Sequence, residues 1–109
     1  MKTIIKIKEN HIFRRAYRRG KALVSPYAVV YVLKNRRDEI RLGITTGKKI
    51  GNAVSRNRAK RVITAAFRYC LPEIEAGRDF IIVARPRILA AKSTAVAASL
   101  SKLLKTADV

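Results

Sequence analysis

Acidic residues are scarce in this sequence. The 109 residues include 7 Asp or Glu against 25 Lys or Arg, which gives a formal net charge of +18. A net charge of this size opposes folding because the cations repel one another, and a bound polyanion would relieve that repulsion. Nucleic acid is therefore the first candidate partner, and an anionic membrane surface is the second. Membrane binding would require a basic helix with a large exposed apolar face, whereas the helices expected here need their apolar faces for a core.

Cysteine and long apolar runs are nearly absent as well. Cys70 is the single cysteine, which excludes an intramolecular disulfide and a metal site built on several cysteines. No apolar run approaches the roughly 20 residues of a membrane span. Residues 1–15 alternate charged and apolar side chains too quickly for a secretory signal. We therefore expect a cytoplasmic protein with no membrane partner, folded as one domain over residues 1–109.

The few acids are scattered along the chain, so no catalytic or metal site is predicted. They are Glu9, Asp38, Glu39, Glu73, Glu75, Asp79 and Asp108. A two-metal nuclease site needs clustered carboxylates, and none falls in the most basic stretch. Asp79 is expected in a turn with Gly77. His11, the one histidine, has no evident partner for acid–base chemistry and is expected to be a capping or surface residue. The sequence predicts a binding protein.

Hydrophobic periodicity predicts an α+β fold in the order α-β-β-β-α-β-α, a two-layer sandwich of a small sheet covered by helices. In chain order we expect an extended basic arm at 2–8, a helix capped by Asn10 and Gly20, a short strand at 22–24, a strand at 27–33, a turn at 35–38, a strand at 40–45, a helix from about Ala53 to Tyr69 or Cys70, a strand at 80–84 and a helix from Ser93. The strand at 40–45 should run antiparallel to the preceding one. The continuous apolar run at 80–84 is typical of a central strand buried on both faces.

The most basic stretch is 47–68, GKKIGNAVSRNRAKRVITAAFR, which contains no acid. Its cations are Lys48, Lys49, Arg56, Arg58, Lys60, Arg61 and Arg68. At 100° per residue, an apolar stripe forms on one side of the expected helix, with a polar stripe nearly opposite. The apolar stripe comprises Ala59, Ile63, Ala66, Phe67 and Cys70, with Val62 at its edge; the polar stripe comprises Asn57, Arg61, Thr64 and Arg68. Asn52 or Ser55 is expected to cap this helix.

RNA is a better match than duplex DNA, because helix-turn-helix and zinc-finger spacings are absent. Phe13, Tyr17 and Tyr31 could stack on single-stranded bases if their rings are exposed. Phe13 and Tyr17 lie at i, i+4 on one helix face, a spacing that a core pair would also show. The sequence leaves both alternatives open.

The block running from Lys48 to Arg61, KKIGNAVSRNRAKR, resembles the signature of the bacterial ribonuclease P protein family. The similarity extends over nearly the whole chain, although the other matching segments are individually weak. This family supplies the small subunit of the RNA-based enzyme that removes 5′ leaders from precursor tRNAs. The resemblance implies a fold like domain 2 of ribosomal protein S5, with a left-handed crossover around the basic helix. It also implies catalysis by a large RNA subunit that binds most of the Mg²⁺.

The resemblance implies two binding surfaces. The surface for the RNA subunit comprises Asn52, Arg56, Asn57, Arg58, Lys60, Arg61 and Arg68. The cleft for the single-stranded leader comprises Phe13, Tyr17, Lys21, Tyr31, Lys48 and Lys49. The expected partners are thus ribonuclease P RNA, with one protein per RNA, and precursor tRNA. A ribosomal or RNA-chaperone protein is the alternative that charge and size also fit, and a self-sufficient nuclease is a distant third.

Overall fold

The computed structural model describes residues 3–106, which contain five β-strands and three α-helices. Their bounds are β1 Ile4–Lys6, α1 Asn10–Arg19, β2 Lys21–Val24, β3 Ala28–Lys34, β4 Ile40–Thr45, α2 Ala53–Cys70, β5 Arg78–Ala84 and α3 Ser93–Thr106. Short 3₁₀ turns occur at Lys48–Ile50, Leu71–Glu73 and Pro86–Ala90. Lys2 of the expected arm and Asp108 lie outside the described residues. None of the described helices is long and apolar enough to cross a membrane.

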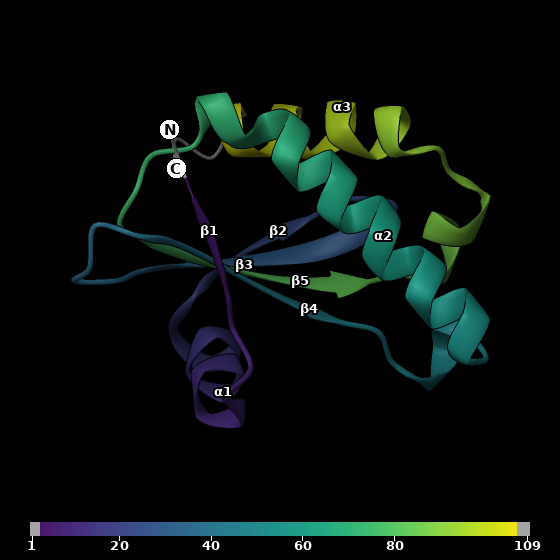
Figure 1. Ribbon diagram of the computed structural model, residues 1–109, viewed down its shortest axis with the longest axis horizontal. Coiled ribbons are helices and arrows are strands. Elements are labelled where there is room, and N and C mark those ends of the chain that lie inside the picture. Colours follow the sequence, from purple (N-terminus) through teal and green to yellow (C-terminus); the bar gives the residue numbers. More distant parts are fainter. Residues whose placement is uncertain (1–2, 107–109) are drawn as a thin grey trace.

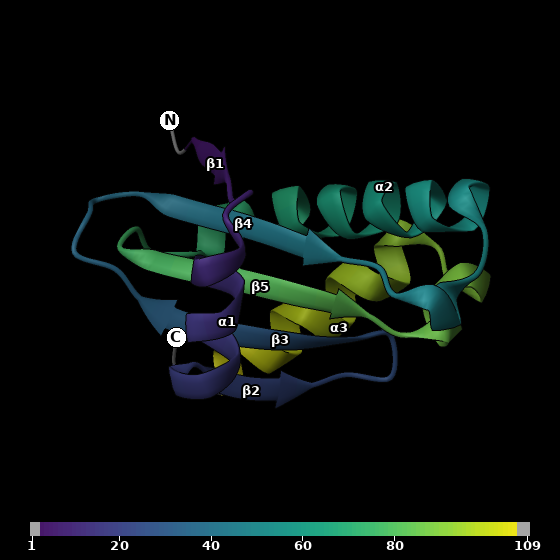
Figure 2. The ribbon, with the colours of Figure 1, turned by 90° about the horizontal axis from the view of Figure 1, so that it is seen from below.

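The strands form one sheet in the order β1-β4-β5-β3-β2 (Figure 2). β5 is central, as predicted, and Phe80, Ile81 and Ile82 are each at most 1% exposed. It pairs in parallel with β4 and antiparallel with β3. β4 therefore runs antiparallel to β3, but the two do not form a hairpin, because β5 lies between them. A strand that is buried on both faces is typically hydrogen-bonded to a neighbouring strand on each side.

Helices cover both faces of the sheet. Figure 1 shows α2 and α3 above it and α1 below it, so α1 extends the expected sandwich on the opposite face. The parallel strands β4 and β5 are joined through α2. Followed through Figures 1 and 2, this crossover is left-handed, as the family resemblance implies and against the usual rule.

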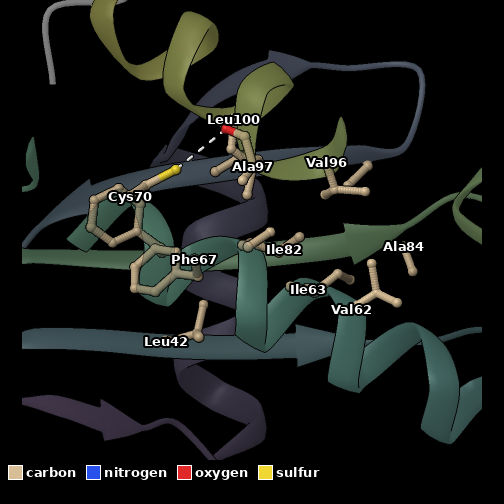
Figure 3. Close-up of a cluster of buried hydrophobic side chains, with 14 of the residues drawn as sticks. Leu42, Val62, Ile63, Phe67, Cys70, Ile82, Ala84, Val96, Ala97 and Leu100 are labelled. Carbon is tan, nitrogen blue, oxygen red and sulfur yellow. Dashed lines mark hydrogen bonds between the residues drawn. The ribbon is translucent and has the colours of Figure 1, made fainter. Parts of the chain in front are cut away.

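The main core lies between the sheet and the pair α2 and α3 (Figure 3). The predicted apolar stripe of α2 faces this core: Ala59, Ile63 and Ala66 are fully buried and Phe67 is 1% exposed. Phe67 meets Phe80 of β5 edge to face, with ring centroids 5.2 Å apart. Cys70 is buried in the same core, and its thiol donates to the carbonyl of Ala97 at 3.4 Å.

The ends of α1 differ from prediction. Glu9 is the N-cap residue and Asn10 is already helical. Gly20 has extended backbone angles, φ −73° and ψ 152°, and not the left-handed conformation of a glycine cap. A glycine suits this position because a Cβ would lie 2.5 Å from the carbonyl oxygen of Ala16. The chain can therefore turn directly from α1 into β2.

Two segments expected outside the sheet belong to it. The basic arm includes β1, which pairs in parallel with β4. Asp79 lies in β5 and not in a turn, and it is 2% exposed. Arg41 of β4 binds both of its carboxylate oxygens, through Nε and Nη2, at 2.6 Å each. Because Arg41 and Asp79 are opposite each other in the parallel register, their side chains leave the sheet on the same face.

Candidate RNA interface

The exposed side of α2 presents the cations predicted from the sequence. Asn52 caps this helix, accepting a hydrogen bond at Oδ1 from the amide of Ser55 at 3.0 Å. Asn57, Arg58, Lys60, Arg61 and Arg68 are exposed, and Arg56 is half-buried. The Nε of Arg56 is buried and has no hydrogen-bond partner within the described residues. The cap thus holds Asn52 to the backbone, while most of the cationic side chains are exposed to solvent.

These cations do not form one flat surface. Arg58 and Lys60 are separated by two residues, or about 200° of helical rotation, so they lie on opposite flanks of α2. Lys60 and Arg68 line a groove of about 290 Å³ between α2 and β1, which we call the β1 groove. Its floor is apolar and includes Ile7, Leu42 and Ile44. Part of the predicted RNA-subunit surface therefore borders a groove.

A second hollow, of about 520 Å³, separates α1 from α2 and is named here the α1 cleft. It is lined by Asn10, Phe13, Arg14, Tyr17, Ile44, Thr45, Thr46 and Lys60. Phe13 is half-buried and packs on the small core beneath α1, yet it also lines the cleft. Tyr17 remains 42% exposed. The two alternatives left open by the sequence therefore both apply, since these aromatic residues belong to the wall of the cleft and pack against the fold.

Gly43 makes room for the Phe13 ring. In β4, alternation places Arg41, Gly43 and Thr45 on the face that α1 covers. A Cβ on Gly43 would lie 2.7 Å from Cζ of Phe13 and 2.8 Å from Cδ1 of Ile81. The absent side chain lets the Phe13 ring lie directly on the sheet.

Tyr31 is not part of the cleft lining but packs against Tyr17, which is. Their rings meet edge to face, with centroids 5.1 Å apart and planes inclined by 74°. Burial raises the pKa of the Tyr17 hydroxyl, and a side-chain hydrogen bond with Thr45 opposes this shift. Tyr17 is therefore a neutral phenol at physiological pH, with part of its ring open to solvent.

The remaining residues of the predicted leader cleft lie elsewhere. Lys21 is opposite Val32 in the β2–β3 register, and Val32 belongs to the core under α2 and α3. Lys21 thus leaves the sheet on the face opposite to Phe13. Lys48 and Lys49 are exposed on the 3₁₀ turn that precedes α2 and are not part of the cleft lining. The structure does not bring these three lysines together with Phe13.

Sequence reasoning missed the cations and hydroxyls that do line the α1 cleft. Arg14 is three residues before Tyr17, a spacing that makes them neighbours on a helix, so this contribution could have been found. Thr45 and Thr46 line the cleft because of the order of the strands in the sheet, and the sequence pattern did not indicate that order. Lys60 was recognised, but as part of the other surface. It lines both the α1 cleft and the β1 groove and so connects them.

No group of three or more potential metal-ligating side chains converges within residues 3–106. Asp79 is occupied by Arg41 and by Asn35, whose Nδ2 donates to Oδ1 at 2.7 Å. The described carboxylates therefore do not fit a protein-bound Mg²⁺ site. His11 is exposed near the start of α1, as expected.

Known proteins resemble this chain in sequence over nearly its whole length. A family model described as Ribonuclease P matches residues 1–108. The ribonuclease P protein component of Clostridioides difficile is 36% identical over 104 residues, covering 94% of this chain and 91% of the relative. That of Staphylococcus haemolyticus is 39% identical over 109 residues, covering 100% and 95%.

Solved structures agree in fold. The Staphylococcus aureus RNase P protein superposes with a TM-score of 0.82 at 38% identity, covering 95% of each chain. The RNase P protein from Thermotoga maritima gives a TM-score of 0.81 at 30% identity, covering 93% of this chain and 96% of the other. The mixed sheet and its three helices are thus shared with both.

Proposed function

Since this chain belongs to the ribonuclease P protein family, and so is the protein subunit of the enzyme that processes tRNA 5′ leaders, we propose that two of its surfaces bind different RNAs. The exposed side of α2 binds the RNA subunit, one protein to each RNA. The α1 cleft holds the single-stranded 5′ leader of precursor tRNA. Residues 1–109 act as one RNA-binding domain, and the RNA subunit with its Mg²⁺ carries the chemistry.

The α1 cleft supports leader binding through its mixture of groups. Tyr17 offers a partly exposed ring on which a base can stack, and Phe13 extends that apolar wall. Arg14 and Lys60 approach from α1 and α2 and can neutralise phosphates on the two sides of a strand. The cleft contains no acidic residue within the described lining. This combination fits an unpaired strand better than a duplex, whose bases are stacked inside.

The α2 surface supports binding of a larger RNA. Its Arg side chains can donate two parallel hydrogen bonds to phosphate oxygens, which favours fixed contacts with a folded backbone. Arg56 and Arg61 are about 140° apart around the helix, so these contacts would follow a curved RNA surface. Lys48 and Lys49 extend the positive charge to the turn before α2. In this arrangement they belong with the RNA-subunit surface.

The leader proposal depends on one observation, the partly exposed wall formed by Phe13 and Tyr17 beside Arg14 and Lys60. Replacing Phe13 with Ala tests it. Holoenzyme affinity for precursor tRNA with a leader should fall by about 5- to 150-fold, equivalent to about 1–3 kcal/mol for one stacked base. Affinity for leaderless tRNA should be unchanged. Tyr69→Ala is the control, because the Tyr69 side chain is 78% exposed and lies near the C-terminal end of α2. Equal losses for both tRNAs would assign Phe13 to packing alone.

A further inference from the structure

A third hollow lies on the other side of α1 from the α1 cleft, near the connection between β3 and β4. We call it the loop hollow; its volume is about 570 Å³. The first half of α1, the end of β3 and the starts of β4 and β5 contribute to its walls. Its basic lining consists of His11, Arg15, Lys34, Arg36, Arg37 and Arg41. Neither predicted RNA surface includes any of these residues.

Positive charge in the loop hollow exceeds what its acids can neutralise. Five Lys or Arg side chains face two carboxylates, those of Glu9 and Asp79. Asp79 is already paired with Arg41, and Glu39, which lies outside the lining, pairs with Arg37 only at 3.5 Å. Arg15, Lys34 and Arg36 are exposed and have no ion-pair partner within residues 3–106. Three exposed cations therefore share this hollow without an ion pair, and Glu9 is the one carboxylate in its lining besides the paired Asp79.

Beneath these cations, one arginine is held in a fixed orientation. Arg41 uses Nε and Nη2 to bind Asp79, so Nη1 remains outside the pair. Asn35 secures the same carboxylate at 2.7 Å and also donates to the carbonyl of Glu39 at 3.3 Å. The Arg41–Asp79–Asn35 cluster is thus a preformed floor. A guanidinium whose position is fixed before binding loses little side-chain entropy when an oxyanion arrives.

We propose that the loop hollow is a second phosphate-binding site for ribonuclease P RNA, remote from the α2 surface. The proposal rests on the RNA-binding function described above. Arg14 lines the α1 cleft and its neighbour Arg15 lines the loop hollow, so α1 separates the two. Figure 2 shows α1 lying across the sheet between the β3–β4 connection and the far ends of β4 and β5. A leader strand in the cleft is therefore separated from this site, and a phosphate of the RNA subunit is the ligand.

Binding of the full-length protein to ribonuclease P RNA tests the site through a matched pair of double variants. Arg15→Gln with Lys34→Gln removes two charges from the loop hollow and leaves the Arg41–Asp79 pair intact. Lys92→Gln with Lys102→Gln removes two exposed charges at α3. The first variant should bind the RNA about tenfold more weakly than the second, as expected when at least one charged hydrogen bond is removed. The slope of log affinity against log salt should also become shallower by about one for each phosphate that the variant no longer neutralises.

The outcomes separate the possible explanations. Equal affinity and equal salt slope for the two variants would mean that only overall charge matters, and would overturn the proposal. Unchanged binding to the RNA, with weaker holoenzyme binding only to precursor tRNA bearing a long leader, would assign the phosphate to the substrate and overturn the RNA-subunit site. Failure of the unsubstituted protein to bind the RNA would overturn the proposed function as well.

Discussion

Gly43→Ala should disturb the α1 cleft from beneath without touching any charge. The new Cβ would lie 2.7 Å from Cζ and 3.0 Å from Cε1 of Phe13, and 2.8 Å from Cδ1 of Ile81. Real Cβ contacts are longer, so the Phe13 ring must move outward or the sheet must shift. Overpacking of this kind costs about 1–3 kcal/mol of unfolding free energy. The displaced ring should also weaken leader binding while affinity for the RNA subunit is maintained.

Equilibrium urea unfolding at constant sulfate concentration would measure the cost of Gly43→Ala, both in the otherwise unsubstituted protein and in a Phe13→Ala background. Without the Phe13 ring the new methyl group has space, so the penalty should shrink and the two substitutions should couple by about 1 kcal/mol. Gly47→Ala is the control, because a Cβ there meets no atom within 4 Å. Effects of Gly43→Ala and Phe13→Ala that add to within about 0.3 kcal/mol would refute packing of the ring on Gly43.

Three further predictions concern stability. Asp79→Ala should cost about 3–5 kcal/mol by leaving Arg41 unpaired, whereas Arg37→Ala, which breaks an exposed pair, should cost less than about 1 kcal/mol; similar unfolding midpoints would contradict this. Burial raises the pKa of the Cys70 thiol, so its stabilising contribution is complete below the unfolded-state pKa and declines as pH rises through the folded value. Cys70→Ser should flatten stability against pH in that alkaline range; an unchanged profile would exclude the thiol as its source. Sulfate should raise the melting temperature more than chloride at equal ionic strength, because bound anions relieve the charge of +18; equal shifts would count against anion binding.

Local sequence patterns were sufficient for the elements whose signals are contained in one segment. The apolar face of α2 and its approximate bounds follow from 3.6-residue periodicity, and Asn52 was one of the two residues expected to cap it. The central position of β5 follows from its unbroken apolar run. The neighbours of β4 could not be predicted this way, because alternation assigns residues to faces but not strands to positions. β1 is only three residues long with two lysines nearby, so its pairing depends on the exposed edge of β4.

The candidate site was predictable where helix spacing alone positions a side chain. Phe13 and Tyr17 share a face of α1, and both line the cleft. Lys21 depends on strand register, which assigns it to the other face of the sheet. The burial of Asp79 depends on Arg41, a partner 38 residues away in the sequence. Contacts of this range become visible only when the order of the strands is known.

Cleavage of a precursor tRNA at low Mg²⁺ tests the central claim most directly. The reactions contain the protein alone, a bacterial ribonuclease P RNA alone, and both together. Mature tRNA and free leader should appear efficiently only in the combined reaction, since the proposed function assigns binding of RNA and leader to the protein and the hydrolysis to the RNA. Cleavage by the protein alone, or no stimulation of the RNA by the protein, would contradict this account.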